Sequence, residues 1–251
     1  MKLSVAMITL NEEKKLEKTL KSIVNIADEI VIVDSGSIDR TKEIAVNYKN
    51  VKFLNQAWLG FGKQKNFAMA NCTGEWVLIL DADEELSKEL QKKIIEIINS
   101  NNSKEVYKIK RVMWCFGRKT RHIDYAVRLI KNGSGQHNEK EVHEEFITSK
   151  EVGIIDEIIN HHTYADIEEY FNKFNKYTTL AAIEMKKRGK RAGVIQAIIN
   201  SFFKFIKKYI IKAGFLDGYV GLLNSILSSF YNFIKYMKLK ELYDKEKFNS
   251  K

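Results

Sequence analysis

The first hundred residues alternate short, almost continuously apolar segments with amphipathic ones, and this alternation constrains the fold more than any other feature of the chain. Apolar segments of strand length occur at residues 3–10, 29–33, 51–54 and 76–80. The segments between and after them have the apolar spacing of helices, and Asn11 and Ser87 are expected to cap two of these helices. Strands that are apolar on both faces need helices on both faces. The pattern therefore predicts an α/β fold with a mostly parallel central sheet flanked by helices.

After about residue 104 the regular alternation of strand-like and helix-like segments ends. Further strands are expected at residues 106–113, 126–130 and 152–159. Asp166 has the position of an N-cap and opens a helix that runs to about residue 187. We predict one domain over residues 1–189, made of the halves 1–103 and 104–189, and a helical tail over residues 190–251.

The tail is both basic and apolar. Residues 186–251 hold 15 Lys/Arg against 4 Asp/Glu, a balance of +11, whereas the first 185 residues balance to −1. Segments 194–211 and 218–237 are rich in Phe, Tyr and Ile, and neither is an uninterrupted apolar stretch of spanning length. This composition predicts an amphipathic helical appendage at an anionic membrane surface. Packing on the domain or on a second subunit, and a true membrane span, are the alternatives. The Phe and Ile content argues against nucleic acid.

Two features predict the cellular compartment. Cys72 and Cys115 are the only cysteines, which indicates neither a disulfide framework nor a structural zinc site. Met1-Lys2 leads directly into the first apolar segment, without the longer apolar core of a signal peptide. We therefore expect a cytoplasmic protein that is peripheral on the inner face of the cytoplasmic membrane.

Polar residues follow three of the predicted parallel strands, at Asn11, Asp34 and Asp81. Ligands bind beyond the carboxyl ends of such strands, so these side chains are expected to converge on one crevice. In Asp81-Ala82-Asp83 the two carboxylates point to the same side and repel, which favours a cation between them. Mg²⁺ and Mn²⁺ commonly bridge a protein carboxylate to a substrate diphosphate, which indicates nucleotide-sugar chemistry. A solvated acidic loop is the alternative reading of the triplet.

Three motifs in residues 1–100 resemble glycosyltransferase family 2 in their order and spacing. They are Thr9-Leu10-Asn11-Glu12, Asp34-Ser35-Gly36-Ser37-Ile38-Asp39-Arg40-Thr41, and Gly74-Glu75-Trp76-Val77-Leu78-Ile79-Leu80-Asp81-Ala82-Asp83. The resemblance implies a GT-A fold and an inverting transfer from a nucleotide-diphosphate sugar, UDP-sugar in particular. It implies that Asp83 holds a divalent cation, Mn²⁺ or Mg²⁺, and that Asp81 approaches the ribose or uracil. The residues implied to surround the nucleotide are Thr9, Asn11, Glu12 and Asp34.

A narrower resemblance covers the second half. Tyr125-Ala126-Val127-Arg128-Leu129, His143-Glu144 and Gly214-Phe215-Leu216-Asp217-Gly218 look like the subgroup that acts in lipopolysaccharide core biosynthesis and includes core β-glucosyltransferases. This chain lacks the proline that the subgroup commonly has near the Tyr125 segment. The resemblance implies that residues 1–103 bind the nucleotide-sugar and residues 104–189 bind the acceptor.

An inverting transfer needs one general base that takes the proton of the acceptor hydroxyl. Glu144 is the predicted base, with Asp124 and Glu145 as rivals. His143 is placed at the diphosphate or the metal shell, with a structural role as the alternative. Arg128 is placed at the diphosphate or at an anionic acceptor, because its planar guanidinium suits phosphate.

Two further polar segments have more than one reading. Lys65 can meet the diphosphate or a loop carboxylate, and a solvated helix face is the alternative. His161-His162 is interpreted as strand-end structure rather than as a ligand site.

The sequence thus predicts a metal-dependent inverting glycosyltransferase that moves a hexose such as glucose from a UDP-sugar to a lipid-linked saccharide such as lipopolysaccharide core. A polyprenyl-phosphate sugar transferase would share the donor half. A nucleotidyltransferase would show a Gly-rich basic loop after its first strand, which this chain lacks. A non-catalytic nucleotide-sugar-binding protein is the alternative outside enzymes.

Overall fold

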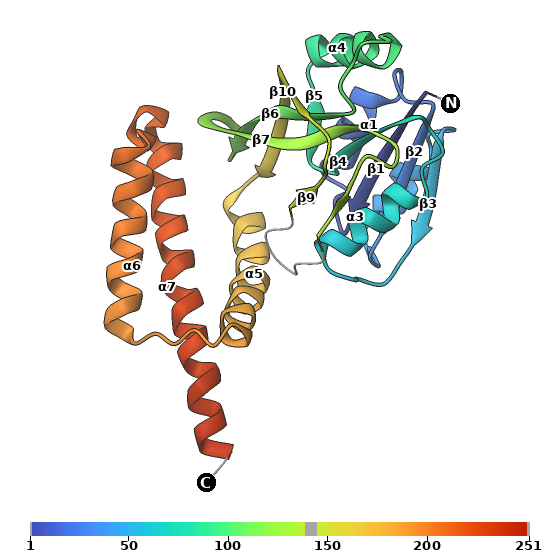
Figure 1. Ribbon diagram of the computed structural model, residues 1–251. Helices are drawn as coiled ribbons and strands as arrows, with labels where there is room; N and C mark the ends of the chain where they lie inside the picture. Colours follow the sequence, from blue (N-terminus) through green and yellow to red (C-terminus); the bar gives the residue numbers. More distant parts are fainter. Residues whose placement is uncertain (1, 139–144, 250–251) are drawn as a thin grey trace. The chain divides into compact units, whose positions relative to one another are not determined.

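The computed structural model describes residues 2–138 and 145–249, and the chain clusters into two compact units (Figure 1). Unit 1 comprises Met1–Met113 and His122–His162, and unit 2 comprises Trp114–Arg121 and Thr163–Lys251. The predicted boundary at residue 190 falls inside unit 2, which begins its main segment at Thr163.

Unit 1 begins with the predicted alternation of strands and helices. Its first elements are β1 (Leu3–Thr9), α1 (Leu16–Ile23), β2 (Glu29–Asp34), α2 (Thr41–Val46), β3 (Val51–Asn55), α3 (Phe61–Ala70), β4 (Trp76–Asp81), β5 (Glu84–Leu86) and α4 (Lys88–Asn99). The later strands are β6 (Val106–Cys115), β7 (Arg118–Lys131), β8 (Gln136–His137), β9 (Phe146–Ile147) and β10 (Val152–Tyr164). The far ends of β6, β7 and β10 enter unit 2.

In the described residues, eight strands form one sheet in the order β3-β2-β1-β4-β7-β6-β10-β5, and β8 pairs with β9. Strands β3, β2, β1 and β4 are parallel, as predicted from their continuous apolar runs. Strand β7 then joins β4 antiparallel, and β5 pairs antiparallel with β10. The carboxyl ends of β1, β2, β3 and β4 therefore lie together at one end of these strands. Strands β7, β6, β10 and β5 continue the same sheet beyond β4.

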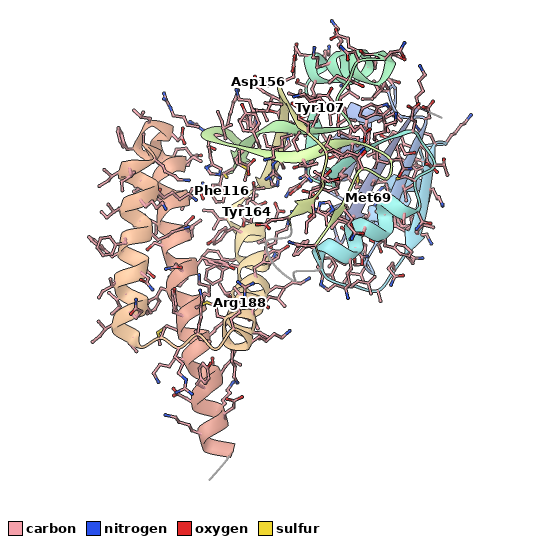
Figure 2. The ribbon with its side chains drawn as sticks, in the orientation of Figure 1. Met69, Tyr107, Phe116, Asp156, Tyr164 and Arg188 are labelled. Carbon is pink, nitrogen blue, oxygen red and sulfur yellow. The ribbon has the colours of Figure 1, made fainter. Side chains whose placement is uncertain are left out.

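Two apolar cores cover the two faces of the parallel strands. One face packs against Leu20 of α1 and Ile94 of α4, together with Tyr107 of β6. The opposite face packs against α3, where Met69 contributes to the core (Figure 2). Alternating residues of β2 serve the two cores, Ile32 on one side and Val33 on the other. Burial on both faces is the physical reason for the apolar strands.

The helix caps follow the sequence in two places and depart from it in one. Ser87 caps α4 by accepting from the Leu90 N–H at 3.2 Å, and Asp166 caps the next helix by accepting from the Glu169 N–H at 2.7 Å. The prediction that Asn11 caps α1 is wrong, because that helix begins only at Leu16 with no side-chain cap. Asn11 instead has a left-handed backbone, φ +54°, and its side chain serves another loop.

Unit 2 is built from three long helices and the outer ends of strands β6, β7 and β10. Its helices are α5 (Ile167–Lys187), α6 (Val194–Ile206) and α7 (Gly218–Asn249), with a π-helical turn η1 (Lys207–Ile211) and a 3₁₀ turn η2 (Gly214–Asp217) between the last two. Phe116 stacks on Tyr164 at 6.3 Å between ring centroids (Figure 2). Phe174 of α5 stacks on Phe230 of α7 at 5.4 Å. This aromatic packing is why α5 clusters with the tail.

The Gly214–Gly218 motif has a structural role within unit 2. Both carboxylate oxygens of Asp217 accept from the Arg121 backbone N–H at 3.1 Å. The side chain of Arg118 lies over the Tyr219 ring, 5.0 Å from its centroid. The turn between α6 and α7 therefore holds the tip of the β6–β7 hairpin.

Candidate functional site

The acidic triplet forms a sharp turn between β4 and β5, at the carboxyl edge of the parallel strands. Asp81 is the last residue of β4 and Glu84 the first of β5. The pairing of β5 with β10 sets His161 opposite Glu84, and the Asp83 carbonyl oxygen accepts from the His162 N–H at 2.9 Å. Two strands distant in sequence thus fix the backbone of this turn.

Asp81 is held by two cations. Its Oδ1 lies 3.2 Å from Lys65 Nζ, and its Oδ2 accepts from Arg128 Nη2 at 2.5 Å. Burial opposes ionisation of this carboxyl, but Arg128 and then Lys65 hold its pKa well below the usual range. Of the contacts predicted for Lys65, the structure therefore has the loop carboxylate. Arg128 is also turned toward this carboxylate, with its side chain only 3% exposed.

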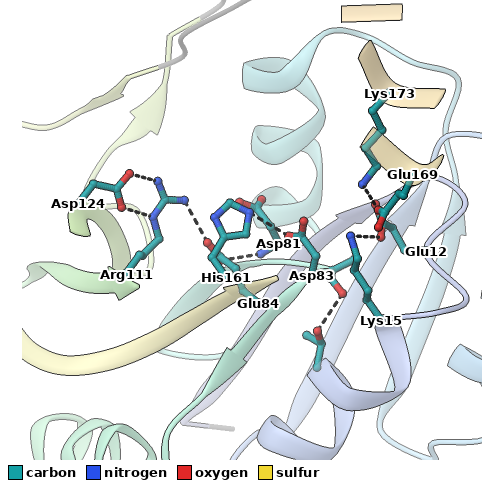
Figure 3. A network of polar contacts seen from close by, with 12 residues as sticks. Glu12, Lys15, Asp81, Asp83, Glu84, Arg111, Asp124, His161, Glu169 and Lys173 are labelled. Carbon is teal, nitrogen blue, oxygen red and sulfur yellow. Dashed lines mark hydrogen bonds and ion pairs between the residues drawn. The ribbon is translucent and has the colours of Figure 1, made fainter. Parts of the chain in front are cut away.

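Glu84 lies at the centre of a charged network that the sequence reasoning missed (Figure 3). Its side chain is fully buried, and its Oε1 accepts from Arg111 Nη1 at 3.0 Å and Arg128 Nη2 at 2.7 Å. Its Oε2 accepts from the Asp81 N–H at 3.0 Å. Arg111 continues the chain of contacts with two bonds to Asp124, at 2.8 and 2.7 Å. The network links β4, β5, β6 and β7 and leaves each arginine with two carboxylates.

Asp124, a rival for the general base, is committed to Arg111. Burial raises the pKa of Asp124, but the hydrogen bonds and charge of Arg111 outweigh it, and the net shift is downward. A carboxylate with a lowered pKa and both oxygens in use is a poor proton acceptor near neutral pH. The geometry thus disfavours Asp124 as the base.

Asp83 faces His161. The Oδ1 of Asp83 lies 3.4 Å from His161 Nε2 (Figure 3). Burial lowers the pKa of His161, but the charge of Asp83 and the hydrogen bond to it produce a net rise. The pKa of Asp83 moves down, since His161 outweighs the effect of burial. The interpretation of His161 as strand-end structure alone is incomplete, and the β5–β10 pairing that brings it here leaves no local sequence signal.

Asp83 and His161 bring one carboxylate oxygen and one imidazole nitrogen together, and both would become available as ligands of one cation once the imidazole is neutral. Asp83 Oδ1 and His161 Nε2 are 3.4 Å apart, near enough that both would contact the same ion. No group of three or more His, Cys, Asp and Glu side chains able to hold a metal occurs within residues 2–138 and 145–249. Asp83 and His161 alone would hold an ion incompletely, so substrate phosphate would have to contribute to binding it.

The loops after β1 and β2 are joined to each other. The Asn11 N–H donates to Ser37 Oγ at 2.8 Å, and Asn11 Oδ1 accepts from the Ile38 N–H at 2.9 Å. The Glu12 N–H donates to Thr41 Oγ1 at 2.9 Å. The left-handed backbone of Asn11 permits this return, which Asn tolerates better than most residues. The two loops therefore form one wall at the carboxyl edge of β1 and β2.

Asp34 fixes the conformation of the loop after β2. Its carboxylate accepts from the Gly36 and Ser37 N–H groups at 2.9 and 2.8 Å, and from Ser37 Oγ at 2.5 Å. Thr9 pairs with Asp34 in the sheet, and its buried Oγ1 has no hydrogen-bond partner among the described residues. The structure thus brings Thr9, Asn11, Glu12 and Asp34 to neighbouring strand ends, as predicted, with Asp34 occupied in holding the loop.

Two predicted residues, His143 and Glu144, lie outside the described residues. The flanking positions are hydrogen-bonded to each other, since the Asn138 N–H donates to the Glu145 carbonyl oxygen at 2.9 Å. Asn138 Oδ1 in turn accepts from the Glu145 N–H at 3.2 Å. On the other side, Asn66 of α3 exchanges two bonds of 2.8 Å with the His137 backbone. Asn138 and Glu145, the described residues on either side of positions 139–144, are thus paired with each other within unit 1.

The family model "Glycosyl transferase family 2" matches residues 4–163 of the chain. The chain belongs to this glycosyltransferase family. The match ends where the main segment of unit 2 begins, so it covers unit 1 with its crevice and stops before the three helices. The predicted GT-A-like α/β fold is therefore confirmed.

Two sequence relatives that cover more than four fifths of this chain are also named glycosyltransferases. An uncharacterised glycosyltransferase of Rickettsia typhi is 33% identical over 87% of this chain and 80% of its own. The lipopolysaccharide core biosynthesis glycosyltransferase LpsC of Rhizobium meliloti is 31% identical over 82% of this chain and 80% of its own. The crystal structure of S. aureus TarS 1–349 covers 98% of this chain and 92% of that chain at 17% identity, with a TM-score of 0.49.

Proposed function

We propose that this glycosyltransferase is metal-dependent and inverting, and moves a hexose from a UDP-sugar to a lipid-linked saccharide such as lipopolysaccharide core. The observation that carries the donor side of the proposal is the Asp83–His161 pair beside Asp81, whose charge Lys65 and Arg128 neutralise. The likeness to LpsC over most of both chains supports the saccharide acceptor.

The two aspartates of the triplet have different partners, and this supports different roles. Lys65 and Arg128 neutralise Asp81, so this carboxylate is poised to accept hydrogen bonds from ribose hydroxyls or the uracil N–H rather than to hold a cation. Asp83 and His161 would hold Mn²⁺ or Mg²⁺ together. When bound, the ion supplies positive charge that stabilises the departing diphosphate.

The protein residues do the remaining work by orientation and proton transfer. Thr9, Asn11, Glu12 and Asp34 form the wall against which the nucleoside would lie. Glu144 remains the proposed base, which would take the acceptor hydroxyl proton as oxygen attacks the anomeric carbon from the face opposite the diphosphate. His143, the preceding residue, is proposed to contact the diphosphate.

The decisive experiment measures UDP release and sugar transfer from a panel of UDP-sugars with Mn²⁺ or Mg²⁺, together with Mn²⁺ binding followed by electron paramagnetic resonance. In Asp83→Asn the charged ligand is lost, so we expect Mn²⁺ affinity in the presence of UDP, and turnover, to fall by at least about a hundredfold. Glu89→Gln, an acid-to-amide change on the exposed face of α4, is the matched control. Full turnover of Asp83→Asn without metal would refute the metal role.

The acceptor and the stereochemistry need separate tests. Proton NMR of the first-formed product is expected to show the β-anomer from an α-linked donor, and retention of configuration would contradict the inverting mechanism. A polyprenyl phosphate and a lipid-linked saccharide are offered side by side. Exclusive use of the polyprenyl phosphate would identify the enzyme as a polyprenyl-phosphate sugar transferase and overturn the proposed acceptor.

A further inference from the structure

Helix α6 in unit 2 is packed inside out. It buries its small residues Ala197 and Ser201, whereas helices of water-soluble domains turn their large apolar residues inward. The large apolar residues of α6 point to solvent along one stripe with helical spacing: Ile195 is 74% exposed, Ile198 54%, Ile199 47%, Phe202 60% and Phe203 63%. Nothing within the described part of the chain covers this stripe.

The partner helix α7 presents small residues in return. Gly221, Ser225 and Ser229 recur every four residues, and Ser229 Oγ donates to the Ser201 carbonyl oxygen at 2.7 Å. Gly221 leaves no room for a side chain, since an added Cβ would lie 1.8 Å from the Gly214 carbonyl oxygen. Close packing on small residues with large apolar residues outside is the pattern of helices that contact lipid.

The charge of this region has one sign. Residues 188–216 contain seven Lys/Arg and no Asp or Glu. On α6 and η1, Gln196, Asn200, Lys204 and Lys207 follow one another at spacings of three or four, so they line one flank of the apolar stripe. Lysines at the edge of an apolar face can lay their methylenes along it and hold the ammonium at the level of lipid phosphates.

We propose that the outer face of α6, defined as the stripe Ile195–Phe203 with its Lys204 and Lys207 flank, docks in the plane of an anionic bilayer surface. The turn after it continues the apolar surface through Ile211, 73% exposed, and Leu216, 51% exposed. This docking surface deepens the proposed function, because it would hold the enzyme where a lipid-linked acceptor resides.

Two other occupants fit the charges less well. A second copy of this chain would bring the same basic flank against itself or near itself, and like charges repel. A membrane span would carry Lys204, Lys207, Lys208 and Lys212 toward the hydrocarbon, where such residues are expensive. No single helix among the described residues is long and apolar enough to cross a membrane. The segments Val194–Ile211 and Gly214–Lys247 have the length and composition of a span only when taken together, and they are bent by 69° relative to each other.

The test is co-sedimentation of the full chain with vesicles of phosphatidylcholine containing about a third phosphatidylglycerol, compared with phosphatidylcholine alone. The wild type is expected to bind the anionic vesicles and to be released by salt, since attraction to anionic lipid is screened. The triple variant Lys204→Gln/Lys207→Gln/Lys212→Gln should bind on the order of a hundredfold more weakly, at roughly fivefold for each lysine. The triple variant Ile195→Ser/Phe202→Ser/Phe203→Ser should lose binding to the anionic vesicles.

Control variants in unit 1 change one exposed isoleucine and three exposed lysines. Ile154→Ser, at a side chain 68% exposed on β10, controls for loss of an exposed isoleucine. Lys49→Gln/Lys88→Gln/Lys92→Gln, at exposed lysines, controls for net charge. Both controls should bind vesicles like the wild type. Circular dichroism checks that each variant is folded.

Each outcome decides the proposal. If the α6 lysine variant and its control bind the anionic vesicles equally well, the α6 lysines do not contact anionic lipid and the proposal is wrong. Resistance of the membrane-bound protein to alkaline extraction would show that the helices span the membrane. A dimer that the α6 apolar substitutions abolish, without vesicle binding, would show that α6 contacts a second copy of the chain. Either result contradicts docking on the membrane surface. Metal-dependent UDP release, measured without vesicles, should be unchanged in all these variants. Vesicle binding and UDP release are therefore independent readouts, so either the docking proposal or the proposed transferase activity can be refuted without refuting the other.

Discussion

The buried carboxylate of Glu84 offers the sharpest quantitative test of the network around the acidic turn. Glu84→Gln keeps the shape of the side chain and removes its charge. Breaking one partner of a buried ion pair costs about 3–5 kcal/mol. Arg111 keeps Asp124 and Arg128 keeps Asp81, so we expect the low end, about 3 kcal/mol. Part of this cost comes from the Asp81 N–H, which would face an amide N–H₂ in place of Glu84 Oε2.

The assay is urea unfolding followed by tryptophan fluorescence in a Trp114→Phe background, which leaves Trp58 and Trp76 as reporters in unit 1. Glu85→Gln is the control one residue away. Glu85 pairs with Lys18 at 2.9 Å and His162 at 3.1 Å on a partly exposed side chain, so its loss should cost less than about 1 kcal/mol. If Glu84→Gln destabilises unit 1 no more than Glu85→Gln does, the network does not fix the turn and the reasoning is wrong.

Two further predictions concern the thiols and the helix pair. Burial raises the pKa of Cys72 to about 12, from an ordinary value near 9, so the native state holds the thiol proton more tightly than the unfolded chain. This proton stabilises the native state fully below about pH 9. As pH rises from about 9 toward 12, the free energy of unfolding should fall by about 1.4 kcal/mol for each pH unit. The Cys72→Ala variant should lack this contribution to the pH dependence. In unit 2, Gly221→Ala should cost about 1–3 kcal/mol through overpacking against the Gly214 carbonyl. Gly193→Ala meets nothing within 4 Å and changes only the N-cap of α6, so it should cost less than about 1 kcal/mol in thermal unfolding. Equal melting temperatures for the two alanine variants would show that the close approach of α7 to the η2 turn at Gly214 is not obligatory.

Local patterns were enough for most elements of residues 1–103. Strands β1, β2 and β4 are buried on both faces, and the cap at Ser87 is a short-range bond to Leu90. The prediction of convergence at the strand ends also depended only on parallel geometry, which places every carboxyl terminus at the same edge. Asn11 failed as a cap because its amide serves Ile38 of another loop, a contact between loops 27 residues apart.

The sequence by itself determined the parallel half-sheet, the family and the acidic triplet at the strand end, because these depend on periodicity and on motifs a few residues long. Only the tertiary structure decided how the triplet is used. The antiparallel pairing of β5 with β10 brings His161 to Asp83, and β6 and β7 carry Arg111 and Arg128 to Glu84. These partners lie 27 to 78 residues apart, and no local pattern specifies which buried cation will neutralise which buried carboxylate. Tertiary packing also decided that α6 turns its large apolar residues outward, since the small residues Ala197 and Ser201 fill the contact with α7.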